Sequence, residues 1–201
     1  MISKELGLAK STLSNWLKEI PYEPNEEAKK RVKKAQNIGQ RNHNQKVKRI
    51  KKTKREAKKE LGGLSHRDLW LLGIGLYLGD GTKSTETAGI MNSNPKIIKL
   101  AVKWFKEVCG AKTENLTLAI HTYPDNNIEE TLDFWSEVTG IPKEQFEKTQ
   151  IDKRQNKKDK KNGKLPYGTA RLRVRARGNK ELGVKLHRKI MGWIEGILNQ
   201  I

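Results

Sequence analysis

The sequence has little of three things: cysteine, long apolar runs and negative charge. The one cysteine, Cys109, can form neither an intrachain disulfide nor a thiolate metal cage, which fits a reducing cytoplasm. The longest apolar stretch, from Leu69 to Leu78, is shorter than the roughly 20 residues that a membrane-spanning helix needs. The N-terminus also lacks a long apolar core, so we expect neither a signal peptide nor a membrane partner.

Positive charge is abundant and unevenly distributed. The 42 Lys and Arg outnumber 23 Asp and Glu, which gives a formal net charge of +19. Residues 26–60 carry +11 and residues 151–180 carry +10, whereas residues 61–150 are mildly acidic. Such charge predicts double-stranded DNA as the partner and no small-molecule substrate, and it suggests a cytoplasmic, nucleoid-associated protein. A solubilising charge run and a basic arm for an anionic membrane are the alternatives.

The first 25 residues predict a short helix-turn-helix. Ile2 to Ile20 reads as two short helices around a break at Gly7, with Ser11 capping the second helix and Pro21 ending it. The stretch resembles the second and third helices of a helix-turn-helix. A complete motif usually has a supporting helix upstream, so we expect an N-terminus that is either minimal or truncated. The exposed face would place small polar and basic side chains in a DNA groove, namely Lys10, Thr12, Ser14, Asn15 and Lys18. A plain helical hairpin is the other interpretation.

Two further regions follow, a basic linker over residues 26–63 and a main domain over residues 64–201. The linker has only scattered aliphatic residues, so we expect a partly helical, exposed segment that orders on DNA. In the main domain the apolar periodicity predicts the order helix, strands, helix, strand, helix, strand, helix. We therefore expect an α+β fold in which a small antiparallel sheet has helices on one face.

The first helix of the main domain ends in GIGLYLGDG, residues 73–81, which resembles the LAGLIDADG motif of homing endonucleases. The matching positions are Gly75, Leu76, Asp80 and Gly81, and Gly79 stands for the small residue before the acid. The likeness covers about nine residues by motif and roughly residues 64–201 by the order of elements. It implies that two such helices pack closely together and that each presents one carboxylate to a metal centre between them.

Only one copy of the motif is present, so the resemblance implies a homodimer. Gly75 and Gly79 would form the dimer seam, Asp80 would be catalytic, and Asp80 with Gly81 would bind Mg²⁺. An Asp at a helix C-terminus faces the negative end of the helix dipole, which a cation would compensate. The protein would then cut a near-palindromic duplex. An ordinary Asp-Gly turn, with Gly81 in the left-handed conformation, is the alternative.

Arginine recurs at every second position near the C-terminus. Alternate residues of a strand share one face, so we expect a row of guanidiniums that contacts DNA, formed by Arg171, Arg173, Arg175 and Arg177. A solvated outer face is the other interpretation. Two function classes follow: a Mg²⁺-dependent homing-type endonuclease, which Asp80 favours, and a non-cleaving DNA-binding regulator, which the helix-turn-helix favours.

Overall fold

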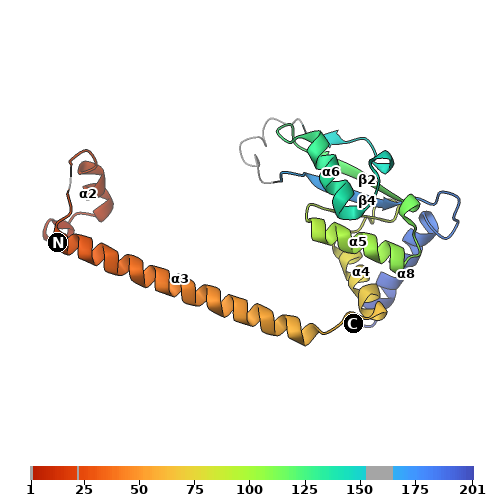
Figure 1. Ribbon diagram of the computed structural model, residues 1–201, viewed down its shortest axis with the longest axis horizontal. Helices are drawn as coiled ribbons and strands as arrows, with labels where there is room; N and C mark the ends of the chain where they lie inside the picture. The colour runs from red at the N-terminus through yellow and green to blue at the C-terminus, as the bar shows by residue number, and fades with distance from the viewer. Residues whose placement is uncertain (1, 22, 153–164) are drawn as a thin grey trace. The chain divides into compact units, whose positions relative to one another are not determined.

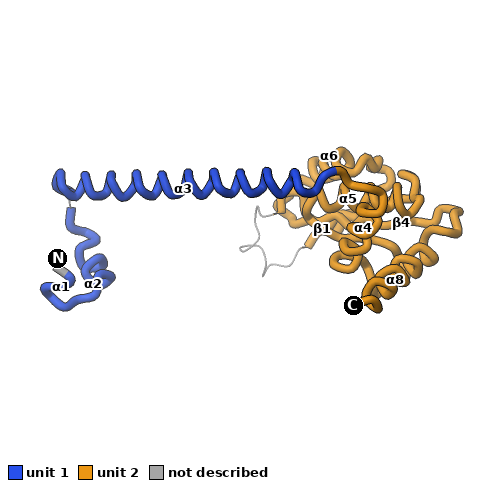
Figure 2. The backbone as a smooth tube through the Cα atoms, turned by 90° about the horizontal axis from the view of Figure 1, so that it is seen from below, with its two compact units in different colours: residues 1–62 blue, residues 63–201 orange. Residues whose placement is uncertain are grey.

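The computed structural model describes residues 2–21, 23–152 and 165–201, and the chain divides into two compact units. Unit 1 comprises residues 1–62 and unit 2 comprises residues 63–201 (Figure 2). The sequence from Asp152 to Lys164 also predicts a basic loop, most of which lies outside the described residues.

Unit 1 begins with two short helices, α1 (Ile2–Glu5) and α2 (Lys10–Trp16), separated by Gly7 with a φ of 63°. The expected pair of helices is confirmed, but its boundaries were wrong. The N-cap of α2 is Ala9 rather than Ser11, because the amide of Leu13 already bonds to the carbonyl of Ala9. The helix stops well before Pro21, and none of its residues is buried, so packing does little to extend it.

The basic linker forms one continuous helix, α3 (Glu26–Leu61), of 36 residues. The side chain of Asn25 caps its first turn by accepting from the amide of Ala28, and Gly62 ends it at a φ of 61°. Our expectation of a partly helical linker was therefore wrong. Lys, Arg, Gln, Glu and Ala are all strong helix formers, which sustains the helix although none of its residues is buried.

Unit 2 contains four α-helices in its described part: α4 (His66–Asp80), α5 (Pro95–Glu107), α6 (Ile128–Thr139) and α8 (Val184–Leu198). Side chains cap the first three, and α4 has a full capping box between Ser65 and Asp68. The last helix begins only at Val184. The chain before it forms a turn in which the amide of Leu182 bonds to the carbonyl of Asn179.

One small sheet accompanies these helices. Its strands are β1 (Gly89–Asn92), β2 (Leu116–Thr122), β3 (Gln150–Ile151) and β4 (Thr169–Val174), in the spatial order β1-β4-β2-β3. β4 pairs antiparallel with both β1 and β2, whereas β3 runs parallel to β2. The α+β class is confirmed, but a purely antiparallel sheet is wrong. The chain leaves β2, crosses over through α6 and returns alongside β2 in the same direction.

Figure 1 shows how the helices and the sheet of unit 2 are arranged. Its core is a single cluster to which all four helices and three strands contribute. Its largest fully buried side chains include Trp104 and Phe105 from α5, Trp135 from α6 and Tyr77 from α4. None of the helices in the described part of the chain has both the length and the apolar run that crossing a membrane requires.

Candidate nucleic-acid interface

β4 separates a buried face from an arginine-bearing face. Ala170, Leu172 and Val174 are at most 1% exposed and belong to the core, whereas Arg171 and Arg173 alternate with them on the opposite side. The register places Met91 of β1 and Ala119 of β2 on either side of Arg171. We call this side of the sheet the arginine face.

The expected row of four strand arginines is only half correct. The strand ends at Val174, so Arg175 follows it and Arg177 lies in a turn with a φ of 41°. That turn closes through a bond from the amide of Asn179 to the carbonyl of Ala176. Period-two alternation therefore holds for Arg171 and Arg173, while the other two arginines extend the basic surface beyond the end of the sheet.

Two of these arginines share one carboxylate. Arg173 donates to one oxygen of Glu147 at 2.7 Å, and Arg175 donates to the other at 2.5 Å. The hydroxyl of Thr117 adds a third bond to Glu147 at 3.1 Å. Glu147 thus fixes both guanidiniums in place, and the two arginines with this one carboxylate have a net charge of +1.

The environment of Glu147 favours its ionised form. Burial by itself would raise the pKa of this carboxyl, but the hydrogen bond from Arg175 and the charge of Arg173 outweigh burial and lower it. The carboxylate consequently stays charged at neutral pH, and the two arginines stay oriented. No sequence spacing indicates this contact, because Glu147 lies 26 and 28 residues from its two partners.

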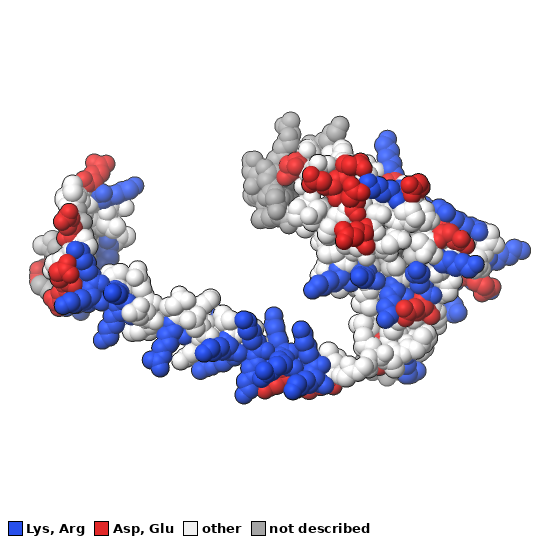
Figure 3. All heavy atoms as spheres, in the orientation of Figure 1, with Lys and Arg blue, Asp and Glu red and all other residues white. Residues whose placement is uncertain are grey.

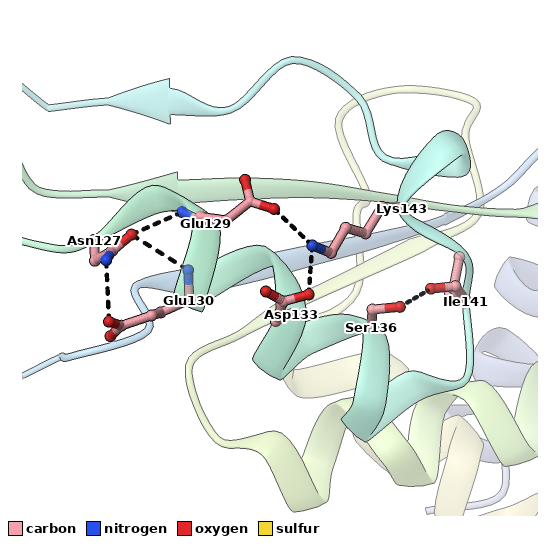
Figure 4. A network of polar contacts seen from close by, with 7 residues as sticks. All are labelled: Asn127, Glu129, Glu130, Asp133, Ser136, Ile141 and Lys143. Atoms are coloured by element: carbon pink, nitrogen blue, oxygen red, sulfur yellow. Dashed lines mark hydrogen bonds and ion pairs between the residues drawn. The ribbon is translucent and has the colours of Figure 1, made fainter.

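Glu147 is held in place by the segment that precedes it. Its amide bonds to the carbonyl of Leu118, which attaches the segment to β2. Just upstream, the short 3-10 helix η2 (Lys143–Gln145) is tied to α6, where Lys143 contacts Glu129 at 2.7 Å and also Asp133 (Figure 4). The ion pairs of α6 therefore help to position the carboxylate on the arginine face.

Asp80 is the last residue of α4, as the motif predicted, and it is exposed. Its carboxylate accepts one hydrogen bond at 2.7 Å, from the side-chain nitrogen Nδ2 of Asn92 at the end of β1. Within the described residues, no group of three or more His, Cys, Asp or Glu could hold a metal ion. Among the described residues, Asp80 therefore offers a carboxylate that is not part of a larger cluster of metal-ligating side chains.

Position 81 requires glycine because the backbone approaches Tyr77 closely, and not because of a left-handed turn. Its φ is −75°, so the alternative of an ordinary left-handed Asp-Gly cap was wrong. A Cβ at Gly81 would lie 2.3 Å from the carbonyl oxygen of Tyr77, and Gly81 forms a bridge with Ile90 of β1. The glycine lets the chain turn directly from α4 toward the sheet.

The other glycines of α4 fall on two sides. A Cβ at Gly73 would lie 1.9 Å from the Trp104 ring, so Gly73 admits close packing against α5. Gly75 and Gly79, the expected dimer seam, are exposed and have open space around them. Their neighbours on the surface of α4 include three leucines that are 39–45% exposed, namely Leu71, Leu72 and Leu78.

The predicted groove-reading residues of unit 1 lie on or beside α2. Lys10, Ser14 and Asn15 are exposed, Thr12 is half-buried, and Lys18 follows the end of the helix. The apolar face that should support them is not packed in the described part of unit 1, since Trp16 is 65% exposed and Ile20 is 58% exposed.

Lys and Arg gather in two parts of α3, residues 29–34 and 46–59, with Arg41 between them (Figure 3). Acidic partners are few and lie near the two ends of the helix, where Glu26 pairs with Lys29, Glu27 with Arg31 and Glu56 with Lys52. Most of the positive charge of this helix is therefore available to an external polyanion.

No family model, curated protein or solved structure matches the chain.

Proposed function

We propose that the chain is a double-stranded DNA-binding protein that contacts the duplex through its arginine face. The observation that carries this proposal is the placement of Arg171 and Arg173 on one side of β4, opposite the core, with Arg175 and Arg177 continuing the basic surface. A two-stranded or larger sheet can lie in the major groove, and guanidiniums bind both guanine edges and phosphates. Such a protein would work at the nucleoid, in the cytoplasm.

The N-terminal unit would add a second contact. α3 is about 54 Å long at 1.5 Å per residue, and its lysines and arginines could neutralise phosphates over that length. α2 would present Lys10, Ser14 and Asn15 to base edges. Because both units are basic, binding would draw on two separate surfaces.

The test is a fluorescence-anisotropy titration of labelled duplex over a range of salt concentrations. The logarithm of the binding constant should fall linearly with the logarithm of salt concentration, with a slope of about −0.9 for each phosphate contacted. Alanine at Arg171, Arg173, Arg175 and Arg177 should weaken binding more than tenfold and flatten the slope. The control replaces three cations of α8, namely Lys185, Arg188 and Lys189. Equal loss in both variants would mean that only overall charge matters, and an unaffected arginine variant would overturn the proposal.

Homodimeric cleavage is the second candidate, and Asp80 is the observation that favours it. Asp80 ends the helix whose exposed side carries Gly75 and Gly79, so pairing two copies through that side would bring two carboxylates near each other. Two carboxylates, one from each copy, could then share a Mg²⁺ ion. A non-cleaving regulator on the same fold would need only the DNA contacts.

A randomised duplex library separates these two candidates. The protein is incubated with the library in the presence and absence of Mg²⁺, and both bound and cut ends are sequenced. A nuclease would give Mg²⁺-dependent ends in a near-palindromic sequence, and Asp80→Asn would abolish them while binding persists, since the change removes one charge and keeps the shape. Enriched bound sequences without cut ends would support the regulator.

A further inference from the structure

A hollow of about 400 Å³ lies at the end of the sheet where β1, β2 and β3 finish and β4 begins. All four strands contribute to its wall, together with the residues that follow β2 and β3. The lining residues include Met91, His121, Tyr123, Gln150, Asp152 and Thr169. The hollow adjoins the arginine face, but Glu147 is not among its lining residues.

One side chain that lines the hollow, and one that does not line it but neighbours it on the arginine face, carry two buried polar atoms with no hydrogen-bond partner within the described part of the chain. They are Nε2 of His121 and Nε of Arg171. His121 pairs with Thr169 in the register, and Arg171 lies two residues further along β4 on the same face, so the two side chains are neighbours. Buried polar atoms are normally satisfied, and two unsatisfied atoms side by side indicate a missing ligand.

The surrounding charges favour an anion. Arg171 and Arg173 face His121 from β4, Tyr123 lies just after the end of β2, and Asp152 lies after β3. Burial, and then the charges of the two arginines, lower the pKa of His121, so the ring is neutral near pH 7. A neutral imidazole can donate one N–H, and the Nε of Arg171 always donates, so an oxygen anion could accept from both. A cation would face two guanidiniums.

We propose that this hollow binds a single phosphate group, whose oxygens accept from Arg171 Nε and His121 Nε2. A backbone phosphate of DNA and the phosphate of a free nucleotide share this chemistry. The DNA source rests on the proposed function, whereas the site itself does not. The bound anion would offset the two arginine charges that His121 faces, which makes protonation of the ring easier.

The experiment follows the imidazole resonances of the full-length chain by NMR during titration with inorganic phosphate, a nucleoside monophosphate and a short duplex. The four histidines are His43, His66, His121 and His187, so three serve as internal references. Phosphate should shift His121 selectively and raise its pKa. If none of the three probes shifts His121, the proposal is overturned.

Two variants test the donors. Arg171→Ala should weaken phosphate binding about tenfold or more, since a hydrogen bond to a charged group is lost. His121→Phe keeps an aromatic ring without its nitrogens and should also weaken binding. Neither change should lower the thermal midpoint, because each removes an unsatisfied buried atom. Arg188→Ala on α8 is the matched control and should bind phosphate like the parent chain.

The probes separate failure of this site from failure of the proposed function. If the duplex binds but neither it nor the two small phosphates shift the His121 resonances, the phosphate site is overturned and the DNA-binding proposal stands. Small phosphates that move His121 in a chain that binds no duplex would support the site and end the DNA-binding proposal. A shift with the duplex alone would assign the hollow to a backbone phosphate.

Discussion

α3 and α4 are both helices, but different forces hold them. α3 has 36 residues, of which none is buried, and it depends on helix propensity, its Asn25 cap and a few ion pairs. α4 has 15 residues and buries one side, including Ile74 and Tyr77, in the core. Its outer side is also apolar, and a helix that is apolar all round is normally covered on all sides. The outer side of α4 therefore leaves apolar surface in water, whereas the surface of α3 is almost entirely polar.

The largest expected effect tests the buried side of α4 against α3. Ile74 is 2% exposed and Ile38 of α3 is 51% exposed, so the same substitution can be compared at both places. Ile74→Ala should lower the free energy of unfolding by about 2–5 kcal/mol, because it removes buried apolar groups from the core and leaves a cavity. Ile38→Ala should change it by no more than about 0.5 kcal/mol. Chemical denaturation followed by tryptophan fluorescence measures both, and equal effects would contradict the comparison.

The next effect concerns the backbone of α3. Asn42 lies in the interior of α3, and Asn42→Pro should cost about 3 kcal/mol or more of helix stability, because the ring removes a hydrogen bond and clashes with the preceding turn. Circular dichroism should show lost helix, while the thermal midpoint of unit 2 stays the same. Asn42→Ala is the control and should retain or increase the helix signal. A shift of the unit 2 midpoint in the proline variant alone would show that the two units are coupled.

A smaller effect tests the outer side of α4. A side chain at Gly75 meets nothing within 4 Å in one chain, so Gly75→Leu should stabilise the isolated helix by up to about 1 kcal/mol. If two copies pair through this side, the same change should separate them by filling the seam. Sedimentation equilibrium at several concentrations measures the dissociation constant.

Gly192 in α8 gives the matched control for this seam. It too lies within a helix with open space around its Cβ position, so Gly192→Leu should gain the same helix propensity. The seam requires that Gly75→Leu dissociates a dimer that Gly192→Leu leaves intact. A parent chain that is monomeric with and without DNA would rule out pairing through α4.

Local signals made much of unit 2 predictable. Ser65 and Asp68 give the start of α4, and Asn94 with Pro95 gives the start of α5, because a cap needs only residues that are close in sequence. β3 was missed because two residues are too short for a periodic pattern. α3 was underestimated because the prediction looked for an apolar face, and a helix of strong formers does not need one.

The candidate site was less predictable than the fold. The alternation of Arg171 and Arg173 with core residues follows from the period of a strand, so it could be read from the sequence. The carboxylate of Glu147 could not, because a distant segment brings it to the sheet. The burial of His121 Nε2 likewise depends on which strands become neighbours and not on its own spacing.

The smallest effect compares the ion pairs of the two units in acid. Glu26 of α3 is 78% exposed in its pair, whereas Glu147 is 24% exposed and binds two arginines. The folded pKa of Glu147 lies below its ordinary value of 4.5, although burial acts in the opposite direction, because Arg175 and Arg173 stabilise the charge. A carboxyl with a lowered pKa contributes stability above the unfolded value, and this contribution disappears as pH falls from about 4.5 through the folded pKa.

Thermal melts of Glu147→Gln should therefore show a weaker loss of stability over that range than the parent chain. Glu26→Gln should follow the parent, since a highly exposed pair contributes little. Parallel curves for all three proteins would mean that Glu147 orients the arginines without stabilising unit 2.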